Sequence, residues 1–406
     1  MRCFYLDPGL RNDVGHHGNF CRYITTAFRR KGIETLVFGH RDVIETLAAE
    51  CDARGHFQTF TYRFSDGDPI AGWLNGFDAG VQSTLEDLQR LPPVHASDLV
   101  YLSTTWPAQL LALLRWYRSL PEPQRPCLIF EVSQGGLSGR RQGEAIHLEL
   151  PDPREDPRAT LYRHIASRHM QPLPLPPRVY FISFDAAMAM AFNQLTGCAI
   201  TTMPLPYKAT GPLRNRAGAV PITLANLGHQ RRTKGYQLMP DIVRSLLRGH
   251  RNIRILIQTV GGDKDVTRPV TDDLQAMAAA DPRLILDDRS TDGSQWATLL
   301  ARADLMLCPY LPATYTTEFS SLACEALTNA IPVIVPAGTT LETLLDACGG
   351  PGVAFAATEA PEILAAINSV LGRFDDYAHK AYLAALAWSE TRGPDRLVER
   401  LVALAA

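Results

Sequence analysis

The sequence predicts an α/β protein made of two doubly wound, Rossmann-like domains. Its 406 residues are too many for one ordinary domain and enough for two. Short apolar runs alternate with helix-like segments along the chain, which is the pattern of parallel sheets joined by crossover helices. The stretch Pro204–Pro221 is rich in Pro and Gly and lacks helical periodicity, so it marks the domain boundary. We therefore expect domains at residues 1–210 and 211–375, followed by C-terminal helices at 376–406.

The predicted strands are short runs of apolar and β-branched residues between turn-forming residues. Helix-like runs such as Trp106–Arg118 and Ala186–Leu195 separate most of them. The strands expected in the first half are Cys3–Leu6, Thr35–Phe38, Phe57–Tyr62, Leu99–Leu102, Leu128–Val132 and Val179–Ile182, and those in the second half are Ile222–Leu227, Ile253–Gln258, Leu284–Leu286, Leu305–Cys308, Val333–Val335 and Val353–Phe355.

The composition is that of a globular protein in a reducing compartment. Hydrophobic residues make up 46% of the chain and charged residues 20%. The net charge of −2 provides no general positive field, so we expect no nucleic-acid partner. The eight Cys are scattered without a CxxC pair and are expected to be reduced. We see no signal peptide after Met1 and no run near the roughly 20 apolar residues of a membrane span, so we expect a cytoplasmic protein.

One segment of the second half has the outline of a nucleotide-sugar site. The apolar run Leu305–Cys308 is followed by a polar loop, the helix N-cap residues Ser320 and Ser321, and a helix-like run that carries Glu325. A helix start beside the carboxyl end of a strand presents backbone N–H groups and a positive dipole end, which suit phosphate. Glu325 is placed to accept hydrogen bonds from sugar hydroxyls. The alternative is an ordinary βαβ unit with a surface Glu.

This segment resembles the nucleotide-binding signature of retaining glycosyltransferases with the GT-B fold, particularly family 4 (glycosyl transferases group 1). The likeness lies in Glu325-Ala326-Leu327 and the following Ile331-Pro332-Val333. It implies that Glu325 holds the nucleotide ribose. In the family an earlier Glu, eight positions before, touches the donor sugar. Thr317 occupies that position here, and Glu318 follows one residue later.

A second segment, ITLANLGHQRRTKG from Ile222, resembles the start of the second domain in the same family. There a Gly-containing turn is followed by cations that bind the donor diphosphate and stabilise its negative charge as the glycosidic bond breaks. The resemblance assigns this role to Lys234 and Arg231, helped by Arg232 and the turn at Gly228. The Arg usually next to the Gly is His229 here. A solvated basic turn is the alternative.

The resemblance extends to the layout of the chain. It implies two domains facing across a cleft, with the last helix crossing back to the first domain, and a donor pocket lined by Tyr310. A Gly-rich loop after the first strand implies an acceptor-side role for Gly15, His16, His17 and Asn19. The adjacent His residues could instead bind a metal or be structural.

Two features depart from the family or point elsewhere. Many members carry a His after the strand equivalent to Leu128–Val132, where this chain has Ser133-Gln134-Gly135-Gly136. The tripeptides Asp66-Gly67-Asp68 and Asp263-Lys264-Asp265 match a metal-binding pattern of another transferase fold, but such tripeptides are common, and we predict no metal site.

The sequence thus predicts a glycosyltransferase that moves a sugar, expected to be a hexose, from a UDP- or GDP-linked donor to an acceptor hydroxyl. By the resemblance it would be retaining, metal-independent and without a cofactor. The acceptor would be a glycan, a lipid-linked molecule or a protein, in polysaccharide or glycoconjugate biosynthesis; peripheral membrane contact and the oligomeric state stay open. The alternatives are a non-catalytic sugar-nucleotide-binding or scaffold protein, motivated by Glu318 and the missing His, and a nucleotide-sugar epimerase. A nicotinamide-dependent enzyme is disfavoured because no GxGxxG follows a strand.

Overall fold

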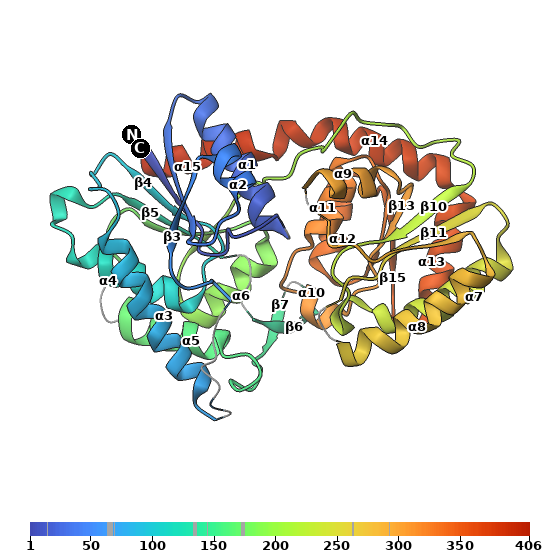
Figure 1. Cartoon of the computed structure of the whole chain (residues 1–406), viewed down its shortest axis with the longest axis horizontal. Helices are drawn as coiled ribbons and strands as arrows, with labels where there is room; N and C mark the ends of the chain where they lie inside the picture. Colours follow the sequence, from blue (N-terminus) through green and yellow to red (C-terminus); the bar gives the residue numbers. More distant parts are fainter. Residues whose placement is uncertain are drawn as a thin grey trace. The chain divides into compact units, whose positions relative to one another are not determined.

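The chain divides into two compact units in the computed structural model (Figure 1). Unit 1 comprises Met1–Pro206 and Arg392–Ala406, and unit 2 comprises Tyr207–Thr391. The boundary between Pro206 and Tyr207 lies within the Pro- and Gly-rich stretch Pro204–Pro221. The structure describes residues 1–13, 15–62, 68, 70–132, 136–143, 145–171, 175–261, 264–291 and 293–406, without the side chains at 264 and 266.

Unit 1 contains a seven-stranded sheet in the order β3-β2-β1-β4-β5-β8-β9, and its paired strands all run parallel. The order reverses between β1 and β4, which is the topological switch point of a doubly wound sheet. The strands are β1 (Arg2–Leu6), β2 (Glu34–His40), β3 (Ala53–Phe57), β4 (Leu99–Leu102), β5 (Cys127–Glu131), β8 (Val179–Ser183) and β9 (Ile200–Thr202). The principal helices are α1 (His16–Arg30), α2 (Glu45–Cys51), α3 (Gly72–Gln89), α4 (Pro107–Ser119), α5 (Arg158–Ile165) and α6 (Ala186–Thr196).

The central strands of unit 1 are buried on both faces. Cys3, Phe4 and Tyr5 are all 0% exposed, although neighbouring strand residues point to opposite faces. Continuous apolar runs of this kind are typical of parallel sheets covered on both sides.

One strand prediction in unit 1 is wrong, and three strands were missed. The run Phe57–Tyr62 was expected to be a strand, but β3 ends at Phe57. Two of the five residues of β3 are exposed. The segment before Phe57 therefore lacks the apolar run by which the other strands were predicted. The polar hairpin of β6 (Ser138–Gln142) and β7 (Ala145–Glu149) and the short strand β9 gave no apolar signal.

Unit 2 contains a six-stranded parallel sheet in the order β12-β11-β10-β13-β14-β15. Its switch point lies between β10 and β13. Helix α7 contacts both α8 and α13 (Figure 1). The strands are β10 (Ile222–Asn226), β11 (Ile253–Gln258), β12 (Leu284–Asp287), β13 (Leu305–Leu307), β14 (Val333–Pro336) and β15 (Gly352–Phe355). The α-helices are α7 (Met239–Gly249), α8 (Lys264–Ala280), α9 (Gly293–Ala301), α10 (Pro312–Tyr315), α11 (Ser321–Thr328), α12 (Thr340–Ala347), α13 (Ala360–Gly372) and α14 (Phe374–Thr391).

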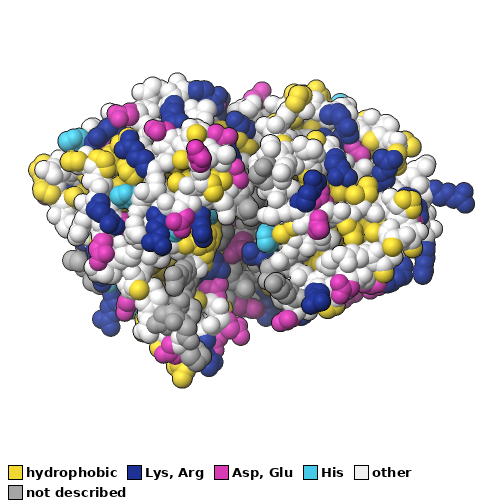
Figure 2. Space-filling view, in the orientation of Figure 1, with side chains coloured by type: hydrophobic (Ala, Val, Ile, Leu, Met, Phe, Trp, Pro, Cys, Tyr) yellow, Lys and Arg dark blue, Asp and Glu magenta, His cyan; other side chains and the backbone are white. Residues whose placement is uncertain are grey.

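The last helix, α15 (Pro394–Ala405), returns to unit 1. Leu397 and Leu401 are 0% exposed, and the carbonyl of Ala405 accepts a hydrogen bond of 2.7 Å from Arg178. The return begins at Arg392, later than the expected residue 376, so α14 belongs to unit 2. Within the described residues, no helix has the length and apolar character needed to cross a membrane. Basic and acidic side chains are interspersed on the face shown in Figure 2.

Candidate functional site

The switch point of unit 2 brings the two predicted segments together. One loop follows β10 and carries Gly228, Arg231 and Lys234; the other follows β13 and leads to α11. In open parallel sheets, ligands bind outside the carboxyl ends of the strands at the point where the strand order reverses. We therefore place the candidate site between these two loops.

The two loops are in direct backbone contact at Gly235. This residue has a φ of +69°, and a Cβ built on it would lie 1.9 Å from the carbonyl oxygen of Pro309. The amide of Leu311 also donates a 2.9 Å hydrogen bond to the carbonyl of Thr233. Glycine is required here because it has no Cβ: it adopts this positive φ without strain and lets the Pro309 carbonyl come this close to its backbone. Gly235 therefore holds the Lys234 turn against the end of β13.

A buried network of side-chain amides fixes the turn at Gly228. The Gly228 amide donates to Oε1 of Gln258 at 2.8 Å. Nε2 of Gln230 donates to Oδ1 of Asn226 at 3.1 Å and to the carbonyl of Gln258 at 2.7 Å. Nδ2 of Asn226 donates to the carbonyl of Leu307 on β13 at 3.1 Å. Sequence reasoning missed Asn226, Gln230 and Gln258 because most of their partners are distant in the sequence.

Lys234 is a half-buried cation at the centre of the site. A Cβ built on Gly228 would lie 3.3 Å from its Nζ, and Nζ lies 5.6 Å from the centroid of the Tyr310 ring. Burial, followed by the charge of Arg231, lowers the pKa of Lys234 to about 8, and the Glu325 carboxylate opposes that shift. No ion pair of Lys234 is found within the described part of the chain. Its charge is therefore available to an anionic ligand.

The other predicted cations lie at the surface of the same loop. Arg231 is exposed, and its charge contributes to the lowered pKa values of Lys234 and His229; burial is the larger cause for both. Arg232 is exposed in the 3₁₀ turn η3 (Arg232–Lys234). Arg231 thus adds to the positive field around Lys234.

Glu325 is a buried carboxylate held by a tryptophan. It is 8% exposed, and its Oε2 accepts a 2.9 Å hydrogen bond from Nε1 of Trp296 on α9. Its charge also acts on Lys234. The carboxylate and the cation therefore belong to one site. Trp296 was missed because nothing in its local sequence indicates a partner 29 residues away.

The start of α11 supplies the remaining predicted donor residues. Oγ of Ser320 accepts a 3.2 Å hydrogen bond from the Ala323 amide, so Ser320 is the N-cap of α11. Oγ of Ser321 accepts a 2.7 Å hydrogen bond from the hydroxyl of Tyr207. Both hydroxyls are thus used to position the helix start beside the site.

The loop before α11 separates Thr317 from Glu318. Thr317 is 0% exposed, whereas Glu318 is half-buried and its carbonyl accepts a 2.6 Å hydrogen bond from Oγ1 of Thr340. Burial and the Glu318 charge raise the pKa of Tyr315, whose ring lies 4.4 Å from that of Tyr310. Glu318 therefore belongs to the same cluster as the ring beneath Lys234.

The residues predicted for the acceptor side lie at the switch point of unit 1. Nδ1 of His17 is 2.9 Å from Oδ1 of Asp7, which follows β1, and its Nε2 is 2.5 Å from the Tyr62 hydroxyl. A Cβ built on Gly9 would lie 2.2 Å from Cε1 of His17, so the loop after β1 closes tightly over the imidazole. His17 is thus the middle of a buried Asp7–His17–Tyr62 chain.

His16 points to the other loop of that switch point. Its Nε2 lies 3.2 Å from Oγ1 of Thr104, which follows β4. Burial and His17 lower the pKa of His16 well below its usual value, so the ring is neutral at pH 7. Gly15 has a φ of +89° and directly precedes α1. Oδ1 of Asn19 accepts a 3.5 Å hydrogen bond from Nη1 of Arg22.

A buried carboxylate completes this region. Oε2 of Glu131, at the end of β5, accepts a 2.8 Å hydrogen bond from the Tyr101 hydroxyl and a 3.3 Å bond from Oγ of Ser103. Glu131 was missed because it ends an apolar run that reads as core. Asp7 was missed as well, although its position directly after a strand was an available signal of a functional residue.

The remaining motifs carry no described site. In the described residues, no group of three or more His, Cys, Asp or Glu could hold a metal. Asp66, Gly67 and Asp263 lie outside those residues, as do Ser133, Gln134 and Gly135. Oδ1 of Asp68 accepts hydrogen bonds from the amides of Ile70 and Ala71, which makes Asp68 a turn-forming residue.

Two Rossmann-like units linked by a returning C-terminal helix define the GT-B fold, and several solved structures that are similar to this chain share it. Sucrose-phosphate synthase from Thermosynechococcus elongatus matches with a TM-score of 0.69 at 13% identity, covering 100% of this chain and 98% of that one. HepE from Anabaena, solved with UDP and glucose, matches with a TM-score of 0.64 at 15% identity, covering 99% and 98%. The trehalose-6-phosphate synthase OtsA matches with a TM-score of 0.64 at 10% identity, with the same coverage. No protein-family model and no curated protein matches the sequence significantly.

Proposed function

We propose that this protein is a glycosyltransferase that moves a sugar from a nucleotide-diphosphate donor to an acceptor hydroxyl. The observation that carries the proposal is the Lys234 ammonium, which has no ion pair among the described residues and lies beside the buried Glu325 at the switch point of unit 2. A cation and a carboxylate at this place match the two ends of a nucleoside diphosphate, its phosphates and its ribose hydroxyls.

In this proposal, the cations act on the leaving group. Lys234 and Arg231 stabilise the negative charge that builds on the diphosphate as the glycosidic bond breaks, so no metal is required. Glu325, held at one oxygen by Trp296, accepts hydrogen bonds from the ribose. Tyr310 lines the pocket beneath Lys234, and Glu318 binds the donor sugar. In the proposed retaining reaction the leaving phosphate is the base, so the reaction requires no protein nucleophile.

The acceptor side is proposed for unit 1. Gly15, His16, His17 and Asn19 lie at or near its switch point, where neutral and paired polar groups can bind hydroxyls. HepE was solved with UDP and glucose, which makes UDP-glucose the first donor to test and a hexose the first sugar. We propose a cytoplasmic enzyme without a cofactor, active in polysaccharide or glycoconjugate biosynthesis.

The experiment is a donor screen followed by a release assay. Thermal shift against UDP- and GDP-linked sugars identifies the donor, and release of free nucleotide is then measured with and without candidate acceptors. Transfer predicts acceptor-dependent release that survives EDTA, and the anomeric configuration of the product, read by NMR, tests retention. Donor binding without release would instead favour the non-catalytic sugar-nucleotide-binding alternative, which Thr317 at the family's Glu position supports. Conversion of the donor sugar without an acceptor would favour the epimerase.

A further inference from the structure

A pocket in unit 2 lies at the amino ends of its strands, the opposite end of the sheet from the candidate donor site. It is lined by Thr223 in β10, Arg254 in β11 and Asp304 just before β13, and its other wall is the segment 214–221, which leads into β10. Its volume is about 510 Å³, which lies in the range of small-molecule sites.

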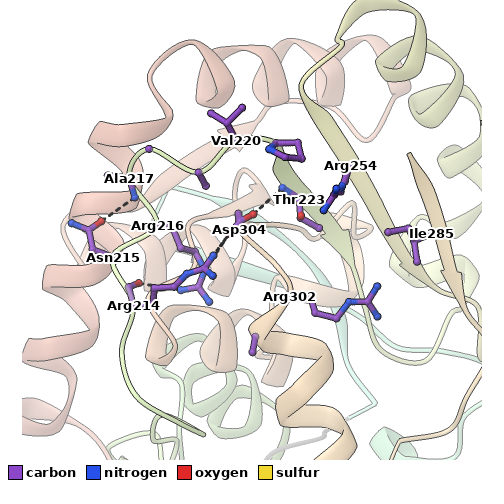
Figure 3. A pocket seen from close by; sticks show the side chains of 14 residues that line it. Arg214, Asn215, Arg216, Ala217, Val220, Thr223, Arg254, Ile285, Arg302 and Asp304 are labelled. Atoms are coloured by element: carbon purple, nitrogen blue, oxygen red, sulfur yellow. Dashed lines mark hydrogen bonds and ion pairs between the residues drawn. The ribbon is translucent and has the colours of Figure 1, made fainter. Parts of the chain in front are cut away.

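The pocket is strongly positive. Four arginines line it (Arg214, Arg216, Arg254 and Arg302), and the only carboxylate among its lining residues is Asp304. Figure 3 shows Arg214 and Arg216 beside Asp304 on one side, and Arg254 and Arg302 with Ile285 on the other. Like charges that line one pocket repel one another unless a counter-charge lies between them.

Asp304 is already used by the protein. It forms an ion pair with Arg214, and its Oδ2 accepts a 3.0 Å hydrogen bond from the Thr223 amide. Nε of Arg216 lies 3.9 Å from Oδ1. The buried Arg216 also donates to the carbonyls of Ala303, at 2.8 Å, and of Asn329, at 2.7 Å. These groups build the wall of the pocket and leave little of the Asp304 charge for the other two arginines.

Arg254 and Arg302 carry the uncompensated charge. Both are exposed, and neither has an ion pair in the described part of the chain. The charge of Arg302 acts on the Asp287 carboxylate, but that carboxylate already binds Arg289, with Nε–Oδ1 and Nη2–Oδ2 distances of 3.0 and 2.6 Å. A dianionic ligand between Arg254 and Arg302 would supply the missing counter-charge.

We propose that this pocket binds a phosphate group, either as free phosphate or as the phosphomonoester of a small organic molecule. Planar guanidinium groups match phosphate oxygens in bidentate pairs. The volume exceeds what one phosphate needs, and Ala219, Val220 and Ile285 offer apolar surface to an organic part. The site is separate from the donor site because it lies at the other ends of the same strands. The inference does not depend on the proposed function.

Isothermal titration of the full chain tests this, with inorganic phosphate, ribose 5-phosphate and ribose as probes and saturating UDP present to occupy the donor site. Wild type should bind phosphate or the ester but not ribose. The double variant Arg254→Gln/Arg302→Gln should bind at least about tenfold more weakly, because it lacks both charged hydrogen-bond donors. Arg248→Gln, an exposed arginine on α7, is the matched control and should bind like wild type.

The two probes separate the two sources of phosphate. Tighter binding of ribose 5-phosphate assigns the pocket to an organic ester, and equal binding assigns it to free phosphate. Failure of both probes to bind wild type in the presence of UDP, or equal binding by the double variant and the control, would overturn the proposal.

Discussion

The two switch points have the same topology and different charge. In unit 1 the order runs β3-β2-β1-β4-β5, and in unit 2 it runs β12-β11-β10-β13-β14. At the first, the polar groups are paired with one another, as in the Asp7–His17 contact. At the second, the Lys234 cation has no ion pair within the described residues. The same backbone scaffold thus offers polar groups that already bind one another in one unit and an available positive charge in the other.

Lys234→Ala removes the available charge at the switch point of unit 2 and should have the largest effect on activity. If Lys234 stabilises charge that builds on the leaving diphosphate, turnover should fall by about a hundredfold or more. Donor binding should weaken by a smaller factor. Steady-state kinetics with the donor found in the screen measures both. Lys380→Ala, an exposed lysine on α14, is the control and should behave like wild type. Unchanged turnover in Lys234→Ala would remove the cation from the chemistry.

Gly235→Ala tests the contact that holds the unit 2 loops together. The φ of +69° and the 1.9 Å approach to the Pro309 oxygen leave no room for a methyl group. We expect the free energy of unfolding to fall by about 2 kcal/mol or more. Chemical denaturation measures it. Gly249→Ala, at the end of α7 with no atom within 4 Å of the added Cβ, is the matched control and should not destabilise. Equal stabilities of the two variants would contradict the close packing at Gly235.

The acidic loop before α11 gives a smaller, more selective effect. If Glu318 binds the donor sugar, Glu318→Gln should lower transfer by about tenfold, the value of one charged hydrogen bond. Affinity for the bare nucleotide should stay nearly unchanged. Thr317→Ala should do little to transfer. If Thr317→Ala lowers transfer and Glu318→Gln does not, Thr317 faces the sugar, at the position that the family's Glu occupies. If neither variant lowers transfer, both residues are excluded from the donor site.

The charge of Lys234 makes nucleotide binding depend on pH. Because its pKa is lowered to about 8, the side chain is a cation below pH 8 and becomes neutral as the pH rises through that value. The contribution of Lys234 to UDP affinity should therefore be constant near pH 6–7 and fall by up to about tenfold between pH 7 and pH 9. Bound diphosphate favours the charged form and raises the pKa of Lys234 in the complex, so the loss begins near the pKa of the free protein and levels off above the pKa of the complex. Lys234→Arg, which stays charged, should remove the dependence; a dependence that survives in Lys234→Arg would assign it to another group.

The sequence specified the sheets better than the site. Central strands such as β4 and β11 were placed at their observed bounds because most of their residues are apolar and β-branched or leucine. The edge strand β3 and the β6–β7 hairpin are polar and carry no such signal. Lys234 and Glu325 were predicted because each belongs to a local sequence pattern. Trp296 was not, because its role exists only when α9 and α11 meet in the folded chain.

The measurement that tests the account most directly is calorimetric titration of UDP into wild type, Glu325→Ala and His16→Ala. The two substitutions remove one polar group from each switch point. The account predicts that Glu325→Ala weakens UDP binding by about ten- to a hundredfold, the effect of losing a charge-assisted hydrogen bond, while His16→Ala binds UDP like wild type. Loss of binding in His16→Ala with none in Glu325→Ala would contradict the account and move the nucleotide site to unit 1.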